Sequence, residues 1–290
     1  MTISRRRFLA IAAAFVGSPA LAKRHSWQGY ALGAEVNISL KGPAELAGPS
    51  LEHAKTLIKE VEAGFSLYDP TSALSQLNRT KQLMPNQEFY ALTKQADAAY
   101  HVTEGLFDPT VQPLWQALAD GGATDQARQA IGWDRVQITH NRISLQPDQA
   151  LTFNGIAQGF ATDLVADLLT ANGFDAALIN IGEYRSTGGT WRLGLQDAKH
   201  GLMGQHTLTR GAIATSDTSA SPLGERGHIL HPKARPFWSS VTVEADTAAW
   251  ADALSTALTL APLDQVRAIK AAANLRRVTL VSFDGELITL

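Results

Sequence analysis

Cysteine is absent from all 290 residues of this chain. Its absence excludes disulfide bridges, thiolate nucleophiles, iron–sulfur clusters and a lipid-modified N-terminal cysteine. The chain also lacks an excess of basic residues, since 25 Lys and Arg are outnumbered by 27 Asp and Glu. A weakly acidic protein has little electrostatic attraction for nucleic acid or for anionic membranes, so we expect neither among its partners.

Long apolar runs are missing too, and the stretch over residues 9–16 is too short to span a bilayer. Arg5-Arg6-Arg7 precedes this stretch, and Ala20-Leu21-Ala22 follows it with small residues in a cleavage pattern. This order is typical of an export signal, and the paired arginines indicate the twin-arginine pathway. We therefore expect residues 1–22 to be removed and residues 23–290 to form one periplasmic domain without a membrane anchor.

The rest of the chain mixes helical and strand patterns without a regular strand–helix–strand alternation. Apolar residues recur at every second position over residues 29–40, which is the period of a half-buried strand. Ser50 is suited to cap a helix over residues 51–65. Further helices are expected over 87–102, 110–119, 155–171 and 248–260, and strands over 136–138, 143–145, 176–181, 191–195, 213–215, 241–244, 278–282 and 287–290. Such interleaving favours an α+β fold with antiparallel sheets flanked by helices.

An oxygen-bearing pair lies on the predicted helix over residues 248–260. Asp252 and Thr256 are four residues apart, so their side chains share one face of that helix. A carboxylate and a hydroxyl on one face suit a small, hard cation such as Mg²⁺, which prefers oxygen ligands. Taken alone, such a short pattern is more often the polar stripe of an amphipathic helix.

Glycines mark the start of the predicted helix over residues 155–171, in the segment Phe153-Asn154-Gly155-Ile156-Ala157-Gln158-Gly159. Glycine lets a ligand approach the backbone closely, and the free N–H groups at a helix start suit phosphate. Close packing between helices is the alternative use of the same glycines, and their spacing favours neither interpretation. A Rossmann dinucleotide fingerprint and a P-loop are both absent from the chain.

Two further segments carry groups able to bind a ligand or move a proton. Thr215 and Ser216 lie in a hydroxyl-rich run at a predicted strand end, where hydroxyls bind phosphate or simply cap a turn. His228 lies beside a turn, and its imidazole titrates near working pH, as a general base requires. His231 follows three residues later, but no wider cluster of His or Cys in the sequence supports a zinc site.

Taken in order, these segments resemble the FAD:protein FMN transferase family, the ApbE-type flavin transferases. Two earlier stretches are similar to motifs of that family, one over residues 72–78 and one that reads Gly105-Leu106-Phe107-Asp108-Pro109-Thr110-Val111. Asn180-Ile181-Gly182-Glu183 is similar to its Asn-x-Gly turn after a strand. The resemblance runs from about residue 29 to residue 260, and its specificity lies in the order of the motifs.

The resemblance implies a T-fold-like α+β fold and an enzyme that binds FAD and a divalent cation, usually Mg²⁺. Such enzymes transfer FMN from FAD to a Thr or Ser hydroxyl of an acceptor flavoprotein subunit and release AMP. By resemblance, Asp252, Thr256 and a backbone carbonyl near Gly155 bind the metal, and His228 is the base for the acceptor hydroxyl. The implied FAD-binding residues are Tyr68, Asp108, Asn154, Gly155, Ala157, Thr215, Ser216 and His228.

Several positions depart from the family pattern. His231 stands where the family usually has Asp before a proline, and Gln158 stands where it usually has Lys. Thr152, Asp217 and Arg235 also differ from the usual residues. These departures leave two alternatives open: a Mg²⁺-dependent FAD pyrophosphatase that yields FMN and AMP, and a non-catalytic flavin-binding protein of the periplasm.

Overall fold

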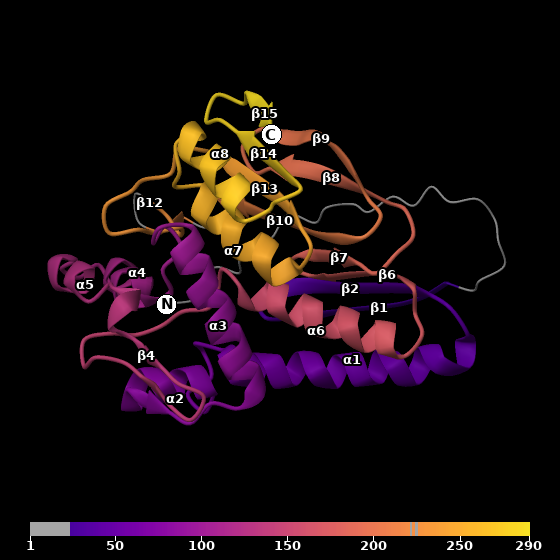
Figure 1. Ribbon diagram of the computed structural model, residues 1–290, viewed down its shortest axis with the longest axis horizontal. Coiled ribbons are helices and arrows are strands. Elements are labelled where there is room, and N and C mark those ends of the chain that lie inside the picture. Colours follow the sequence, from indigo (N-terminus) through magenta and orange to yellow (C-terminus); the bar gives the residue numbers. More distant parts are fainter. Residues whose placement is uncertain (1–23, 221, 224–225) are drawn as a thin grey trace.

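The computed structural model describes residues 24–220, 222–223 and 226–290, so the predicted signal over residues 1–22 lies outside the described residues. An antiparallel sheet forms the frame of the fold, with the order β1-β2-β6-β7-β10-β13-β14-β15 in space (Figure 1). Its strands are β1 (Arg24–Ala31), β2 (Ala34–Lys41), β6 (Ala176–Ile181), β7 (Tyr184–Ser186), β10 (Gly211–Asp217), β13 (Ser240–Ala245), β14 (Arg277–Val281) and β15 (Leu287–Thr289). Helices pack against this antiparallel sheet, which confirms the predicted α+β class.

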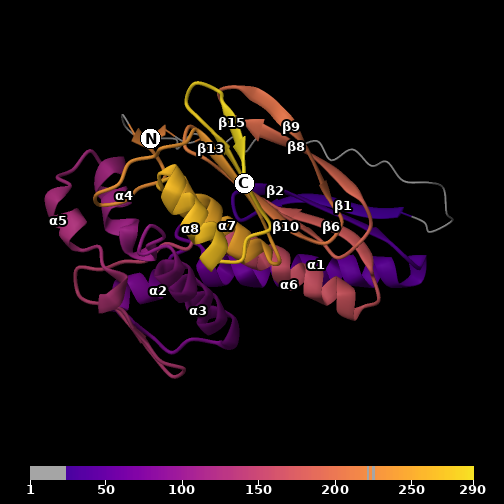
Figure 2. The same ribbon diagram turned by 45° about the horizontal axis from the view of Figure 1, so that its top comes forward.

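Two long helices, α1 (Ala44–Phe65) and α6 (Ala157–Ala171), run side by side along the sheet, and α7 (Ala248–Leu258) packs on β10 and β13 (Figures 1 and 2). The other helices are α2 (Ala73–Thr80), α3 (Gln87–Val102), α4 (Gln112–Ala119), α5 (Asp125–Gln129) and α8 (Leu263–Ala272), with 3₁₀ helices η1 (Pro109–Val111) and η2 (Trp133–Arg135). Smaller sheets are formed by β3 (Gln82–Leu83), β5 (Ile143–Ser144) and β4 (Gln137–Ile138), by β8 (Trp191–Asp197) and β9 (Gly201–Leu208), and by β11 (Pro222–Leu223) and β12 (Arg226–Gly227).

The prediction of one strand over residues 29–40 was wrong, because the chain reverses at Leu32 and Gly33. Both residues have positive φ, 51° and 78°, as the two centre residues of a tight hairpin turn require. Leu32 continues the apolar alternation through the turn, so periodicity alone does not reveal the break. Its N–H donates to Glu62 of α1, and its carbonyl accepts from Gln158 of α6, which ties the turn to both helices.

The prediction that Ser50 caps the first helix was also wrong, since α1 begins at Ala44, seven residues before the predicted first residue of the helix. Ser50 is buried inside α1, where its hydroxyl accepts a hydrogen bond from Asn172 Nδ2 at 3.1 Å. Pro49 made the earlier start hard to predict from the sequence, because proline usually marks a helix boundary and is rarely found in the second turn of a helix. The predicted hairpins over residues 136–145 and 278–290 are confirmed as β4–β5 and β14–β15.

Aromatic packing fixes the segment that leads into α6. The ring of Phe65, at the end of α1, stacks on Phe89 of α3 with centroids 5.1 Å apart. Phe153 and Phe160 pack edge-on against the same ring at 5.8 and 6.1 Å. Buried aromatic pairs of this kind add about 0.5–1.5 kcal/mol each beyond their buried area. The backbone that enters α6 therefore rests on a rigid core.

Helices α6 and α7 each supply a carboxylate that accepts hydrogen bonds from N–H groups at the start of the other helix. Asp163 of α6 accepts hydrogen bonds from the N–H groups of Ala248 and Ala249, at 2.7 and 2.9 Å. In return, Asp252 of α7 accepts one from the N–H of Gly159, at 3.2 Å. The first N–H groups of a helix have no partner inside it, so each helix supplies the acceptor that the other needs.

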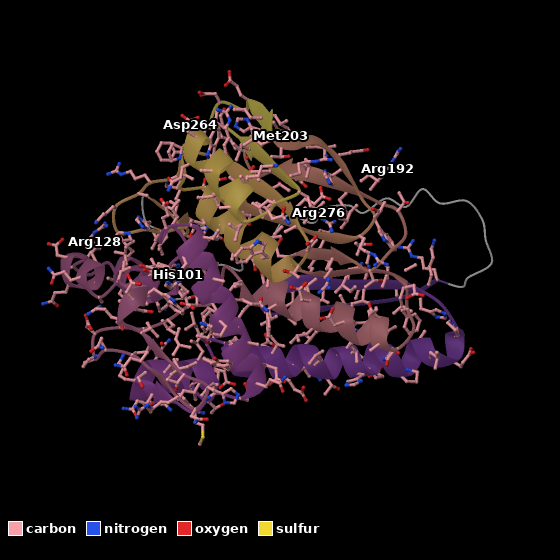
Figure 3. All side chains as sticks on the ribbon, viewed as in Figure 1. His101, Arg128, Arg192, Met203, Asp264 and Arg276 are labelled. Carbon is pink, nitrogen blue, oxygen red and sulfur yellow. The ribbon has the colours of Figure 1, made fainter. Side chains whose placement is uncertain are left out.

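Polar and charged groups cover the outside of this frame. Arg192, Asp264 and Arg276, labelled in Figure 3, are exposed. Among the described residues, no helix combines the length and the apolar character needed to cross a lipid bilayer.

Candidate active site

A cavity of about 780 Å³ is lined by elements that lie far apart in the sequence. Its walls come from the β1–β2 hairpin, the segment before η1, the start of α6, the end of β10, the turn after β12 and one face of α7. The size falls within the range of small-molecule sites. The cavity is lined by most of the residues implied to bind FAD or metal: Asp108, Asn154, Gly155, Thr215, Ser216, His228, Asp252 and Thr256.

Asp252 reaches the cavity from the buried side of α7 and is only 4% exposed. Its Oδ2 is held by the N–H of Gly159, while Oδ1 takes part in no hydrogen bond within the described part of the chain. Burial raises the pKa of the Asp252 carboxyl, because water no longer stabilises its charge. A cation in the cavity would therefore stabilise the ionised form.

Thr256 lies one turn along α7 on the same face as Asp252. Ser216, near the end of β10, shares hydrogen bonds with the hydroxyls of Ser255 at 2.8 Å and Thr256 at 3.1 Å. The backbone of Gly155 adjoins this cluster, because a Cβ at Gly155 would lie 3.1 Å from Thr256 Oγ1. The backbone of Gly155 therefore lies beside the Thr256 hydroxyl, and both groups are predicted to bind the same metal ion.

The two glycines of the segment serve different purposes. A Cβ at Gly159 would lie 2.3 Å from the Ala248 carbonyl, so this glycine allows α6 and α7 to touch. Gly155 instead lines the cavity, and space there is limited by the side chains of Thr256 and Phe107. The packing interpretation thus holds at Gly159, whereas Gly155 lies in the cavity wall, where a ligand can reach its backbone.

The donor set fits a small divalent cation. Asp252 offers a carboxylate oxygen, Thr256 a hydroxyl and Gly155 a backbone carbonyl, and all three residues line one cavity. Oxygen donors are what Mg²⁺ and Mn²⁺ prefer, and Mg²⁺ commonly takes its remaining ligands from water and phosphate. No group of three or more His, Cys, Asp and Glu side chains placed to hold a metal occurs among the described residues.

Glu183 is a site residue that sequence reasoning missed. It follows Gly182, whose φ of +88° turns the chain back from β6 into β7. The side chain lines the cavity and is only 7% exposed, and Thr215 N–H donates to its Oε2 at 3.1 Å. Burial, and then the charge of Asp252, raise the pKa of the Glu183 carboxyl. The sequence signal was an acid directly after a glycine turn, which indicated only a turn.

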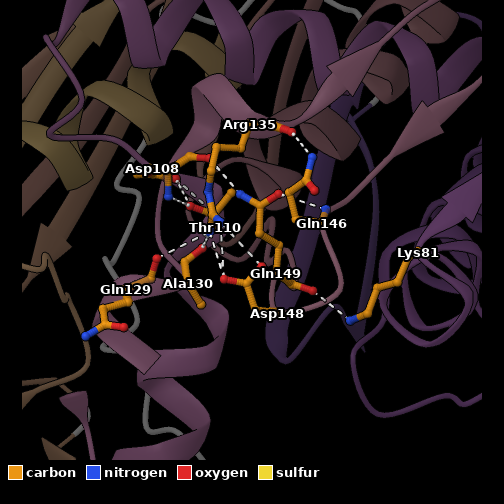
Figure 4. A network of polar contacts seen from close by, with 10 residues as sticks. Lys81, Asp108, Thr110, Gln129, Ala130, Arg135, Gln146, Asp148 and Gln149 are labelled. Carbon is orange, nitrogen blue, oxygen red and sulfur yellow. Dashed lines mark hydrogen bonds and ion pairs between the residues drawn. The ribbon is translucent and has the colours of Figure 1, made fainter. Parts of the chain in front are cut away.

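Asp108 lies at the cavity wall but is held by its own segment. It accepts hydrogen bonds from the N–H and the hydroxyl of Thr110, at 2.8 and 2.6 Å, and thereby caps η1. Thr110 in turn accepts from the N–H of Gly132, and Gln149 donates to the Gly132 carbonyl (Figure 4). This network makes Asp108 a rigid part of the wall.

The remaining predicted contacts are placed as follows. Asn154 is exposed at the cavity, and Thr215 lines it while its hydroxyl bonds to Thr242 at 2.9 Å. Ala157 is buried in the first turn of α6, outside the cavity lining. Tyr68 is 71% exposed on the turn after α1 and is also outside the lining, so this structure does not bring its ring to the cavity wall. Its contact with FAD stays a prediction.

His228 lies directly after β12 and lines the same cavity as Asp252 and Thr256. The imidazole is partly buried, with its Nδ1 atom removed from solvent. A partly desolvated imidazole beside a binding cavity is suited to accept a proton from a group bound there. The structure therefore brings the predicted base and the predicted metal ligands into one site.

Comparison with known proteins gives relatives along most of the chain. FAD:protein FMN transferase from Vibrio cholerae is 29% identical over 81% of this chain and 82% of its own length. The enzyme of the same name from Haemophilus influenzae is 25% identical, with 82% and 80% covered. The structure of flavin transferase ApbE from Vibrio cholerae superposes with a TM-score of 0.82 at 24% identity, over 93% of this chain and 97% of that one.

The apbe protein of Thermotoga maritima superposes equally well, with a TM-score of 0.82 at 24% identity over 92% of this chain and 96% of that chain. At such identities the superpositions establish the fold. The sequence profile of the ApbE family matches residues 32–279, which is most of the chain. This protein therefore belongs to the ApbE family.

Proposed function

We propose that this protein transfers FMN from FAD to a Thr or Ser hydroxyl of an acceptor protein, releases AMP, and requires a divalent cation, Mg²⁺ by preference. The observation that carries the proposal is that Asp252, Thr256, Gly155 and His228 all line one cavity. The names of the relatives, which match along most of their length, support the same activity.

Each residue has a chemical task in this proposal. Asp252, Thr256 and the Gly155 carbonyl would hold the cation, which when bound offsets the negative charge that grows on the departing AMP phosphate. The acceptor hydroxyl oxygen attacks the FMN phosphorus, and the bond between this phosphorus and the oxygen of AMP breaks. His228 takes the proton of the hydroxyl. The N–H groups of Ala157 and Gly159 at the start of α6 already donate to the Phe153 carbonyl and to Asp252, so the phosphate contact expected at this helix start is not assigned to them.

We also propose that the protein acts in the periplasm after twin-arginine export. The support is the order of arginines, apolar stretch and Ala20-Leu21-Ala22 in the sequence. An acceptor flavoprotein subunit in the same compartment is the partner that this location implies.

His231, which departs from the family pattern, keeps one chemical property of the usual aspartate. Its Nδ1 accepts hydrogen bonds from the N–H groups of Lys233 and Ala234, at 3.2 and 2.8 Å, as a carboxylate at this position could. Burial, and then the charge of Lys233, lower the pKa of His231 from 6.5, while a backbone hydrogen bond with Gly105 opposes the shift. The neutral imidazole therefore closes the turn that follows His228.

The first prediction tests the activity and its metal. Incubated with FAD, Mg²⁺ and a purified acceptor domain, the wild type should yield an acceptor heavier by one FMN in mass spectrometry. Asp252→Asn keeps the acceptor for Gly159 N–H but weakens the metal site, so transfer should fall at least about a hundredfold. Chelation by EDTA should have the same effect.

Asp264→Asn, an exposed acid at the start of α8, is the matched control and should transfer at the wild-type rate. Free FMN and AMP without a labelled acceptor would make the protein a pyrophosphatase. Unchanged FAD, with metal present, would support the non-catalytic flavin-binding alternative.

The second prediction concerns the base. His228→Gln should lower the rate of FMN transfer by roughly 10²–10⁴-fold, the usual loss when a general base is removed, while the dissociation constant for FAD changes little. His140→Gln, an exposed histidine in the β4–β5 turn, serves as the control. Wild-type transfer by His228→Gln would show that the proton goes to another group.

The third prediction concerns the pH dependence of stability. A lowered pKa in the folded protein means that the unfolded chain binds the proton more readily, so His231 destabilises the fold as the pH falls below about 6.5. His231→Asp keeps an acceptor that stays ionised to about pH 4. Between pH 7 and pH 5 the melting temperature of the wild type should therefore fall further than that of His231→Asp. Equal decreases in the melting temperatures of the two proteins would show that protonation of His231 does not destabilise the fold.

A further inference from the structure

Three buried acids, Asp163, Asp252 and Glu183, lie where α6, α7 and the sheet meet, and only one of them is paired with a basic side chain among the described residues. Asp163 accepts two backbone N–H groups and pairs with Arg185 at 2.7 Å. Asp252 and Glu183 have no such cation, since neither takes part in an ion pair among the described residues. Uncompensated buried charge is expensive for a fold, so this difference requires an explanation.

Asp252 and Glu183 are held in the same manner from opposite elements. One oxygen of Asp252 accepts from Gly159 N–H of α6, and one oxygen of Glu183 accepts from Thr215 N–H of β10. The second oxygen of each takes part in no hydrogen bond within the part of the chain that the structure describes. Both residues line the cavity, so each carboxylate is fixed at one oxygen and open at the other.

The backbone around Glu183 is fixed as well. The Thr162 hydroxyl of α6 donates to the Glu183 carbonyl at 3.2 Å, which ties the turn that carries Glu183 to this helix. Gln158, the nearby position where the family usually has lysine, is neutral and donates its amide to the Leu32 carbonyl instead. Among the described residues, neither Asp252 nor Glu183 therefore forms an ion pair with a positive side chain.

We propose that Glu183 is a second carboxylate ligand of the divalent cation, which it shares with Asp252; this inference rests on the metal site of the proposed function. Two carboxylates and one divalent cation sum to zero charge, which resolves the lack of a basic partner. The site then needs no lysine at position 158, because the neutral Gln158 leaves the net charge of the two carboxylates and the cation at zero.

The competing explanation is a permanently protonated Glu183 that serves only to pack the turn. The two explanations differ in metal binding without FAD. Mn²⁺ binding to the purified protein, measured by electron paramagnetic resonance and by calorimetry, should weaken about 10–100-fold in Glu183→Gln. The amide keeps an acceptor for Thr215 N–H and nearly the same volume, so the fold should persist. Glu35→Gln, an exposed acid on the wall of the same cavity, is the matched control and should bind Mn²⁺ like the wild type.

Thermal unfolding without metal supplies an independent measurement. Glu183→Gln replaces a buried acid that forms no ion pair among the described residues, so its melting temperature in EDTA should equal or exceed that of the wild type. The rise in its melting temperature on addition of Mn²⁺ should be smaller than in the wild type. Wild-type Mn²⁺ affinity and an unchanged Mn²⁺ gain in melting temperature would overturn the assignment of Glu183.

The outcomes separate this inference from the proposed function. A Glu183→Gln protein that binds Mn²⁺ normally, in a wild type that transfers FMN, contradicts only the role of Glu183. A wild type that transfers no FMN but loses Mn²⁺ affinity through Glu183→Gln contradicts only the proposed reaction. Loss of Mn²⁺ binding in Asp252→Asn but not in Glu183→Gln would leave Asp252 as the carboxylate ligand and overturn the second one.

Discussion

The site depends on the hydrogen bonds by which a carboxylate of α6 holds the start of α7 and a carboxylate of α7 holds the start of α6. Asp163 accepts the first N–H groups of α7, and Asp252 accepts the N–H of Gly159 in α6. Each of these hydrogen bonds satisfies a buried N–H group. Leaving such a donor without a partner would cost about 1–3 kcal/mol. Neither helix can slide along the other without breaking these bonds. Asp252 therefore holds the two helices together through Oδ2 and also lines the cavity.

This contact is possible only because Gly159 lets the helices touch, since any side chain there would collide with the Ala248 carbonyl. The site is then completed by elements that meet these helix ends: β10 supplies hydroxyls, the β6–β7 turn supplies Glu183, and the turn after β12 supplies His228. Asp252 and Glu183 are buried and form no ion pair among the described residues, which costs the fold stability. Local departures of this kind from the rules of stable folding are expected where a protein binds its ligand.

Much of this arrangement could be predicted from the sequence, and the failures have physical causes. Spacing on one helix paired Asp252 with Thr256, because helical periodicity determines which residues share a face. The fold class followed from the interleaving of patterns. The turn at Leu32 was missed because an apolar residue continued the alternation through it. Glu183 was missed because its partners Thr215 and Asp252 lie far away in the sequence, and only the sheet brings them together.

The most direct test of the account is the position of the metal. Crystals grown with FAD and Mn²⁺, measured at a wavelength where manganese scatters anomalously, would locate the cation without reference to any assay. The account predicts an anomalous peak bounded by oxygens of Asp252, Thr256 and Gly155, beside the phosphates of FAD. A peak elsewhere, or FAD bound in the cavity with no metal at these oxygens, would contradict it.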